Sequence, residues 1–575
     1  MIIAAGIAFL IADLSESSDA AVTDGQCGGA LYWSYDPDTA ELTVTGAGMM
    51  YDRYINEERW GGNPVETVIL SDGITAIGRY CFEGCSELRS IEIPGSVTLI
   101  DSGAFENCSS LSSITVPDSV TRIGDYAFRN CTSLEDVTIP GSIEWINSNV
   151  FAGCISLKSI DIPDGVTRIH NSAFYGCTAL ISVKIPDTVT YVGFESFAGC
   201  TSLTSVTIGV DVETIDRMAF SDCFRLAEVI DRSDLGIQAG SSDHGSVSYY
   251  AVSVKTSGTS DISESDGSLI LDTGDSCLLV AYIGDDIEVY VPSAVTSIGR
   301  YAFYGCENMT SVIIPNTVTS IADDAFHGCT GLTSAEIDCT VISGCFRGLT
   351  GLESVVMGDS VLSVDASAFE GCTGLRSVIL GGSVSSVGNN AFRGCDAIAT
   401  VEILCPEIGS CFRGLQNLDT VILGVGNTKV GQYAFFGCTG LTSLEINGDL
   451  SIVGNFAFYG CSGLSDFTLP EGLSSIGNRS FKGCTSLTSV TIPDSVEAIG
   501  NNAFEGCTSL ESATLPHPFS GNIFEGCTSL RNITYTQWGE DVSLEQQSGE
   551  DLRLLVVAIL VGAFLLSVPV LFRRL

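Results

Sequence analysis

Short segments in which apolar and polar residues alternate recur along this chain, each followed by a turn and a second apolar piece. In Leu203–Gly209 and Leu487–Pro493 the alternate residues are valine and isoleucine, which predicts a short, half-buried strand. Proline ends the second of these segments, because proline cannot donate a hydrogen bond to a continuing ladder. Val496–Ile499 then predicts another extended piece, Gly500 a sharp bend, and Ala503-Phe504 the start of a helical or 3-10 turn.

This unit repeats with a fixed period. A phenylalanine followed three residues later by a cysteine marks most copies, and the cysteines from Cys85 to Cys223 are 23 residues apart. The pattern resumes at Cys306 and runs to Cys527. A fixed period of this length predicts a solenoid of stacked units, here called rungs, rather than one globular core. The phenylalanines give seven rungs from Phe82 to Phe220 and eleven from Phe303 to Phe524.

The repeat resembles the BspA-type leucine-rich repeat, which occurs in surface proteins of bacteria, archaea and protists. The resemblance implies a leucine-rich repeat solenoid, mostly β with short helical or 3-10 turns, and adhesion or ligand binding at the cell surface. In one rung it rests on Leu487, Val490, Ile492-Pro493, Val496, Ile499-Gly500, Ala503-Phe504 and Gly506-Cys507. The N-terminal residues resemble the family's usual opening, with Cys27-Gly-Gly, Leu31-Tyr-Trp33, Leu42 through Gly48, and Trp60.

Both ends of the chain predict export and membrane attachment. Met1–Ile11 is apolar and precedes the small-residue stretch Ser15–Ala21, as in a secretory signal without its basic beginning. Residues 553–572 are nearly uncharged and long enough to cross about 30 Å of hydrocarbon as a C-terminal transmembrane helix. Arg573 and Arg574 then favour a cytoplasmic C-terminus, which leaves the bulk of a single-pass protein outside the cell. The expected order is a signal-like segment (1–21), an N-terminal cap (22–64), a first array (65–223), an irregular island (224–290), a second array (291–534), a stalk (535–552), the transmembrane helix (553–572) and a cytoplasmic tail (573–575).

The chain is strongly acidic. It has 69 acidic and 25 basic residues, which gives a net charge of −44. Such a surface repels nucleic acid and anionic lipid headgroups, so we expect neither as a partner of the extracellular part. Cations and basic patches of other proteins stay open as partners. The alternative is that the acidity only keeps a long, exposed rod soluble.

Most of the 23 cysteines stand three residues after the repeated phenylalanine. Stacked equivalents would lie about 4.8 Å apart, whereas a disulfide needs Cβ atoms about 3.8 Å apart, so we expect buried, unbonded thiols. Two pairs differ, because Cys339/Cys345 and Cys405/Cys411 share one spacing in rungs shortened to 20 residues. They are candidate local disulfides. Alternatively Cys345 and Cys411, like Cys81, fill a small position that alanine takes in other rungs.

The second array carries the best candidate for a binding surface. In each predicted strand the valine and isoleucine point inward, and the residue before each of them points outward. The first outward residue is nearly always serine, whereas the second varies between apolar and acidic, as in solenoids that present a readable surface. The alternative is an ordinary strand surface partly covered by its neighbours. The candidate partner-binding residues are Ile313, Glu336, Val356, Ile379, Glu402, Ile422 and Glu445.

The island at 224–290 breaks the repeat and is rich in serine, glycine and aspartate. Ser248–Val254, Leu269–Leu271 and Leu278–Ile283 have the composition of strands. One interpretation is a binding module with an aromatic edge, because insertions in solenoids often map to the binding face. The other is an irregular rung that completes the stack. The aromatic residues are Tyr249, Tyr250, Tyr282 and Tyr290, and the first two join the candidate partner-binding residues.

The sequence gives no support for catalysis. Its four histidines are scattered, and Asp272-Thr-Gly274, although similar to an aspartic protease motif, is expected to form a turn because that chemistry needs two carboxylates at one site. We therefore expect no enzyme, no cofactor and no metal site. The expected function is adhesion to a surface protein or glycan of a host or neighbouring cell through the solenoid face. The alternative is a passive structural or shielding envelope protein without a specific ligand.

Overall fold

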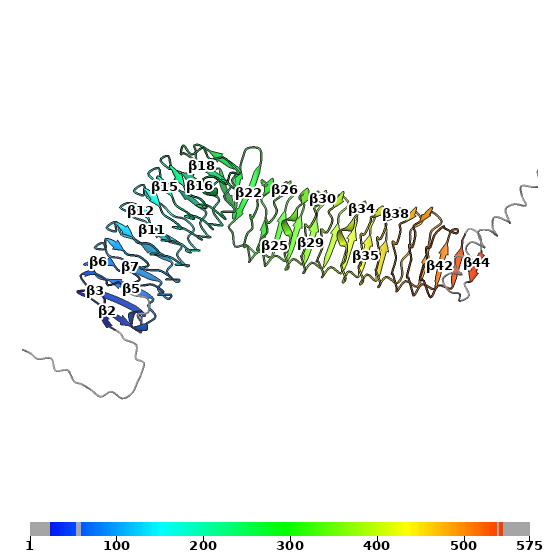
Figure 1. The fold of residues 1–575 in the computed structure, drawn as a ribbon, viewed down its shortest axis with the longest axis horizontal. Coiled ribbons are helices and arrows are strands. Elements are labelled where there is room, and N and C mark those ends of the chain that lie inside the picture. Colours follow the sequence, from blue (N-terminus) through cyan, green and yellow to red (C-terminus); the bar gives the residue numbers. More distant parts are fainter. Residues whose placement is uncertain (1–23, 53–58, 537–539, 544–575) are drawn as a thin grey trace, which may run out of the picture. The chain divides into compact units, whose positions relative to one another are not determined.

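The computed structural model describes residues 24–52, 59–536 and 540–543. The chain forms two compact units, which divide between Ser260 and Asp261. In each unit short strands joined by hydrogen-bonded turns stack side by side (Figure 1). The predicted β-solenoid is therefore confirmed for the residues that the structure describes.

Most rungs of the first unit contribute a longer strand to one side and a shorter strand to another. The cap strands β1 to β3 pair antiparallel, and the pairs that follow are parallel. The longer strands are β1 (Asp24–Gln26), β2 (Leu31–Asp36), β3 (Glu41–Gly46), β5 (Thr67–Leu70), β7 (Ser90–Glu92), β9 (Ser113–Thr115), β11 (Asp136–Thr138), β14 (Ser182–Lys184), β16 (Ser205–Ile208), β18 (Glu228–Asp231) and β19 (Ser253–Lys255). The strands of the other side are β4 (Gly48–Met49), β6 (Ile74–Ile77), β8 (Leu99–Ile100), β10 (Arg122–Ile123), β12 (Trp145–Ile146), β13 (Arg168–Ile169), β15 (Tyr191–Val192) and β17 (Thr214–Ile215), and the 3-10 turns are η1 (Arg59–Gly62) and η2 (His244–Ser246).

The second unit begins with an antiparallel meander and continues as a parallel solenoid. The meander is β20 (Ile262–Ser265), β21 (Ser268–Asp272) and β22 (Cys277–Tyr282). The longer strands are β23 (Glu288–Tyr290), β25 (Ser311–Ile314), β27 (Ser334–Ile337), β29 (Ser354–Met357), β31 (Ser377–Leu380), β33 (Thr400–Ile403), β35 (Thr420–Leu423), β37 (Ser443–Ile446), β40 (Ser489–Thr491), β42 (Ser512–Leu515), β43 (Asn532–Tyr535) and β44 (Glu540–Ser543). The shorter strands are β24 (Ser297–Ile298), β26 (Ser320–Ile321), β28 (Val341–Ile342), β30 (Ser363–Val364), β32 (Ser386–Val387), β34 (Glu407–Ile408), β36 (Lys429–Val430), β38 (Ile452–Val453), β39 (Ser475–Ile476) and β41 (Ala498–Ile499), and the 3-10 turns are η3 (Gly344–Phe346) and η4 (Ser410–Phe412).

The alternation along each longer strand sets its inward and outward faces. In β31, Val378 and Leu380 are buried while Ser377 and Ile379 are exposed, as predicted. The predicted helical or 3-10 turn at the phenylalanine forms a 3-10 turn in two of the shortened rungs, as η3 and η4. Most of the other rungs make hydrogen-bonded turns there instead.

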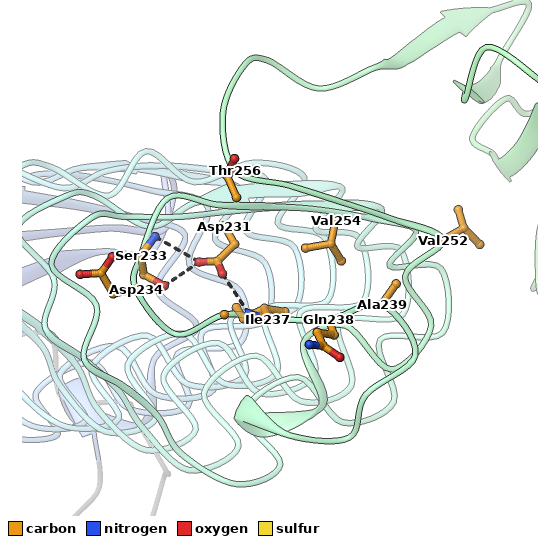
Figure 2. Close-up of a pocket in the computed structure, with 10 residues that line it drawn as sticks. Asp231, Ser233, Asp234, Ile237, Gln238, Ala239, Val252, Val254 and Thr256 are labelled. Carbon is orange, nitrogen blue, oxygen red and sulfur yellow. Dashed lines mark hydrogen bonds between the residues drawn. The ribbon is translucent and has the colours of Figure 1, made fainter.

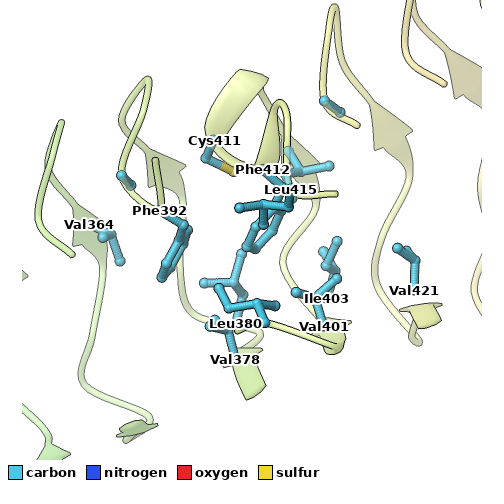
Figure 3. Close-up of a cluster of buried hydrophobic side chains, with 14 of the residues drawn as sticks. Val364, Val378, Leu380, Phe392, Val401, Ile403, Cys411, Phe412, Leu415 and Val421 are labelled. Carbon is cyan, nitrogen blue, oxygen red and sulfur yellow. The ribbon is translucent and has the colours of Figure 1, made fainter. Parts of the chain in front are cut away.

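The repeated phenylalanines form a continuous buried column within each unit. Their rings stack nearly parallel, with centroids 5.0–5.5 Å apart from Phe82 to Phe220 and 4.7–5.9 Å apart from Phe303 to Phe524. Figure 3 shows Phe392 and Phe412 among the valine, isoleucine and leucine side chains of neighbouring rungs. Trp60 covers the first column at Phe82, and Tyr282 covers the second at Phe303.

The cysteines bind the rungs to one another through hydrogen bonds. The Cys108 thiol donates to the carbonyl oxygen of Phe82 in the preceding rung, and Cys131 donates in the same way to Phe105. Equivalent bonds of 3.0–3.5 Å recur in both units. The same Phe82 carbonyl also accepts from the backbone N–H of Cys85, so both of its lone pairs are used. Cysteine is therefore not only a small apolar residue here, since its S–H satisfies a buried acceptor.

The four cysteines of the candidate disulfides are unbonded thiols in the structure. Burial raises the pKa of Cys345 and Cys411, and negative charge on Cys339 and on Cys405, respectively, raises it further. Burial is the larger cause of the raised pKa in both residues. Formation of these two disulfides on oxidation stays a prediction.

The island at 224–290 is shared between the two units. Its first part adds β18 and β19 to the first unit, and its second part forms the meander that begins the second.

The predicted signal-like segment and transmembrane helix lie outside the described residues, as does most of the predicted stalk. Within the described ranges, no helix is long and apolar enough to cross a bilayer.

Replacement of Phe392 by alanine tests the aromatic column. This side chain is fully buried between Phe369 and Phe412. We expect the free energy of unfolding to fall by about 3–5 kcal/mol, because removal of the ring leaves a cavity in the core. The neighbouring rungs cannot move in to fill this cavity, since each is held in place by the rest of the stack. Urea unfolding followed by circular dichroism measures this loss, with Thr373→Ala, on an exposed turn, as the control. Equal stabilities of the two variants would show that the column does not hold the stack together.

The buried thiols predict loss of stability at alkaline pH. Burial raises the pKa of Cys131 and Cys200 from 9.0 to about 12, because the uncharged thiol is favoured in the core. The contribution to stability is therefore fully present below pH 9 and is lost as the pH rises toward 12. Urea midpoints measured from pH 8 to 11 under reducing conditions should fall over this window. A midpoint that stays level would contradict the predicted burial of ionisable thiols.

Mild oxidation tests the two cysteine pairs. Treatment of the native protein with diamide should give peptides cross-linked between Cys339 and Cys345 and between Cys405 and Cys411, detected by mass spectrometry. Cys108 and Cys131 are the internal control and should stay reduced, because equivalent residues of stacked rungs are about 4.8 Å apart, whereas a disulfide needs Cβ atoms about 3.8 Å apart. If all four paired cysteines stay reduced under conditions that oxidise the partly exposed Cys277, the pairs only fill space.

Candidate functional site

The predicted binding residues of the second unit form one ladder on its eight-stranded parallel sheet. Each outward residue lies beside the equivalent residue of the next strand. The pairs are Ile313 with Glu336, Glu336 with Val356, Ile379 with Glu402, Glu402 with Ile422, and Ile422 with Glu445. β29 and β31 pair through the residues just before Val356 and Ile379, which makes the ladder continuous. These seven residues are called the stripe below.

The stripe is open to solvent at its centre. Val356 is 57% exposed and Ile379 is 46% exposed, which leaves two neighbouring apolar side chains uncovered. Glu336 and Glu445 are exposed as well, while Ile313, Glu402 and Ile422 are half-buried. Exposed apolar residues are common as single side chains, but a contiguous set framed by charges is typical of an interaction surface.

The three glutamates of the stripe have no basic partner in the described part of the chain. Other charges nearby are paired, since Arg376 lies 3.7 Å from Glu353 and Lys429 lies 2.7 Å from Glu407. Glu402 and Glu445 are two strands apart, or about 10 Å, which is close to the screening length at physiological salt. Their repulsion is therefore weak, and their negative potential is directed at solvent.

The tyrosines of the island are not one edge. Tyr249 is 51% exposed and meets Tyr250 edge to face, with ring centroids 4.8 Å apart, and both belong to the first unit. Tyr282 is buried, with its hydroxyl donating to Asp286 at 2.7 Å. Tyr290 is exposed and pairs with Ile313, so it extends the stripe by one strand. Because Tyr282 is buried, the interpretation of these four tyrosines as one exposed aromatic edge is wrong.

Sequence reasoning missed Tyr290 as a stripe residue, although a signal was present. Glu288-Val-Tyr290 has the same outward, inward, outward order as Ser311-Val-Ile313 one rung later. Its position within the irregular island concealed the match, because the first regular phenylalanine of the second array follows it.

A cluster of aromatic and basic side chains on the turn side of the second unit was also missed. It surrounds a hollow of about 450 Å³ and consists of Arg413, Tyr433, Phe436, Phe456, Tyr459, Arg479 and Lys482. Tyr433 stacks on Phe456 and Phe436 stacks on Tyr459, with ring centroids 5.0 and 4.8 Å apart. This set is called the turn patch below. Arg413 follows the phenylalanine of a shortened rung, and the other patch residues stand two before or one after the phenylalanine of three consecutive rungs. This register was visible in the sequence, but it does not give the direction of the side chains.

A larger hollow of about 680 Å³ lies in the first unit and has a structural explanation. Figure 2 shows Asp231 at its wall, with its carboxylate accepting hydrogen bonds from the backbone N–H groups of Ser233 and Ile237 and from the Ser233 hydroxyl. These bonds of 2.6–3.1 Å hold the turn that follows β18. The Asp231 carboxylate therefore has a structural role.

The described residues hold no arrangement suited to metal binding. No group of three histidine, cysteine, aspartate or glutamate side chains could hold a metal ion in the described ranges. Asp272-Thr-Gly274 forms a turn after β21, in which the Asp272 carboxylate accepts from the backbone N–H of Gly274 at 2.8 Å. The predicted turn at this motif is confirmed.

Three solved structures resemble the chain in part. A leucine-rich repeat protein from Bacteroides ovatus is 22% identical, with 84% of this chain and 93% of that chain covered and a TM-score of 0.32. A leucine rich cell surface protein from Faecalibacterium prausnitzii is also 22% identical, with 75% and 96% covered and a TM-score of 0.27. The pneumococcal vaccine antigen PcpA is 14% identical, with 83% and 98% covered and a TM-score of 0.22. The comparison with curated proteins gave no match.

The family model gives a wider match. The BspA type leucine rich repeat region matches six copies, over residues 53–181, 171–237, 286–399, 339–447 and 407–531. These ranges take in the rungs of both units and the columns of phenylalanine and cysteine described above. The chain therefore belongs to the BspA-type leucine-rich repeat family.

Proposed function

We propose that this protein binds a macromolecular partner, a surface protein or a glycan, through the stripe of the second unit. The observation that carries the proposal is a continuous ladder of solvent-facing apolar and acidic residues whose charges lack a partner within the described chain. Val356 and Ile379 supply apolar area to bury, and Glu336, Glu402 and Glu445 favour a partner with complementary basic groups.

The proposal includes a location at the cell surface. The apolar N-terminal segment supports export, and residues 553–572 have the composition of a membrane anchor. The protein would present its solenoid outward from a single-pass anchor, with the stripe available to molecules of a host or neighbouring cell. Tyr249 of the first unit, which exposes half of its surface, is a second candidate contact.

A passive structural role is the second candidate function. The first unit favours it, because outward positions over much of its length, such as Ser113, Thr115 and Thr138, are polar. On this proposal the first unit would act as a spacer or shield and no specific ligand would exist. The two candidates make opposite predictions about the stripe.

Charge reversal of the stripe tests the proposed function. The variant Glu336→Arg, Glu402→Arg and Glu445→Arg should weaken partner binding by about tenfold or more, since complementary charges at an interface become repulsive. Its stability should change little, because these side chains point away from the core. The measurement is binding of the soluble part, residues 27–540, to immobilised mucins, matrix proteins, polysaccharides and whole microbial cells.

The matched control reverses the charge of three exposed acidic residues of the first unit by substitution with arginine. These residues are Glu92, Asp136 and Asp161. It should bind as the unchanged protein does. If the stripe variant is folded and binds with unchanged affinity, the stripe is not the binding surface. If the unchanged protein binds nothing in any class, the structural role is favoured.

A further inference from the structure

We propose that the partner of the stripe is the turn patch of a second copy of this chain. This inference rests on the proposed function of the stripe and names its occupant. Both surfaces belong to the second unit, so the argument does not depend on how the two units are arranged.

The turn patch has unpaired positive charge in a chain of net charge −44. Lys482 of the patch, and Arg129, Arg347 and Arg393 of equivalent turns in other rungs, each lie within 4 Å of a glutamate. Arg413 and Arg479 have no such partner in the described part of the chain. Their guanidinium groups lie over aromatic rings instead, Arg413 at 4.7 Å from the Phe436 centroid and Arg479 at 5.8 Å from that of Phe456. Stacking of this kind orders an arginine while its N–H groups stay available to carboxylates.

The backbone of the patch indicates that its bulky side chains are not the easiest choice for the fold. Tyr433, Phe456 and Arg479 have φ values of 60°, 56° and 51°, in the left-handed region. Asn390 and Asn502 occupy the same position in other rungs, where asparagine tolerates this conformation better. Single rungs elsewhere also have a large residue at this position, as Tyr80, Tyr126 and Tyr301 show, whereas the patch has three in consecutive rungs, which is consistent with a role in contact.

The order of residue types in the two surfaces is complementary. Over four successive strands, the stripe runs acidic, apolar, apolar, acidic, from Glu336 through Val356 and Ile379 to Glu402. Over four successive rungs, the patch runs basic, aromatic, aromatic, basic, from Arg413 through the Tyr433 and Phe456 rungs to Arg479. Each arginine can thus face a glutamate while the two aliphatic side chains enter the hollow among the aromatic rings.

The spacing of residues along the stripe is close to that along the turn patch, because the distance between successive rungs determines both. Three strand steps span about 14 Å on the sheet side. For the turn side, the distance between successive rungs is taken from the phenylalanine column, whose ring centroids are 5.2–5.9 Å apart from Phe412 to Phe481. Over three rungs the two surfaces differ by about 2 Å, which a flexible arginine side chain can take up. A contact between different faces of two copies is heterologous, so it can link more than two chains in a row.

The test uses the full chain in detergent micelles at 0.15 M salt, where general repulsion between the acidic copies is screened beyond about 8 Å. Sedimentation velocity of the fluorescently labelled protein should show association that increases with concentration into the micromolar range. A stripe variant, Glu336→Arg with Glu402→Arg, and a patch variant, Arg413→Glu with Arg479→Glu, should each associate at least tenfold more weakly.

Mixing the two variants gives the decisive result. In the mixture the unchanged patch of the stripe variant can bind the unchanged stripe of the patch variant, and the two reversed surfaces also have opposite charges. The mixture should therefore associate as strongly as the unchanged protein, within about threefold. Such rescue also shows that both variants are folded. The control variant, Arg168→Glu with Arg217→Glu, removes two exposed arginines that lie over rings in the first unit and should associate normally.

The inference is overturned if the unchanged protein stays monomeric, if the patch variant associates normally, or if mixing fails to restore association. Its failure is distinguishable from that of the proposed function, because the patch variant keeps the stripe intact. If that variant still captures a foreign protein or glycan in the binding screen while no self-association exists, the stripe binds a different partner.

Discussion

Stacking imposes one requirement on every rung, which is to present its hydrogen-bonding groups and buried side chains at the same height as the rung before it. The Phe82 N–H donates to the Ala104 carbonyl of the next rung, and the Cys108 thiol of that rung donates back to the Phe82 carbonyl. The rings of Phe82 and Phe105 stack on each other between the same two rungs. A side chain of another size or polarity at these positions would break contacts on both sides, because each rung is the surface on which the next one packs.

The same requirement leaves the outward positions free. A residue such as Ile379 or Glu402 takes part in the ladder through its backbone, so its side chain can change without loss of a rung contact. The solenoid therefore separates a constant interior from a variable exterior. Variation at one register position becomes a line of side chains at regular spacing, and a line on the sheet side and a line on the turn side share nearly the same spacing. This is the physical basis for matching the stripe to the turn patch.

The strands and the stripe followed from local pattern, and the reason is visible in particular residues. Alternation in Ser377-Val-Ile-Leu380 fixes which side chains enter the core, since successive residues of a strand point to opposite faces. The repeat then places Glu402 beside Ile379 without further information, because equivalent residues of stacked rungs are neighbours. Exclusion of disulfides along the cysteine column came from the same spacing. The thiol's hydrogen bond to the phenylalanine carbonyl did not, because it depends on how the turn is oriented toward the preceding rung.

The gathering of the turn patch and the division of the island between the two units could not be predicted from local alternation. Residues of the turns have no two-residue alternation, and their directions depend on the left-handed backbone at Tyr433, Phe456 and Arg479, which only the folded turn reveals. In the island, Tyr282 and Tyr290 have similar sequence surroundings, yet one is buried against Phe303 and the other is exposed beside Ile313. The sequence by itself determined the rung, its period and the inward face, because these follow from local alternation and from repetition. The tertiary structure decided which turn side chains gather into one surface and where the stack is interrupted. The first depends on the orientation of each turn, and the second on contacts of the island, where the repeat is absent.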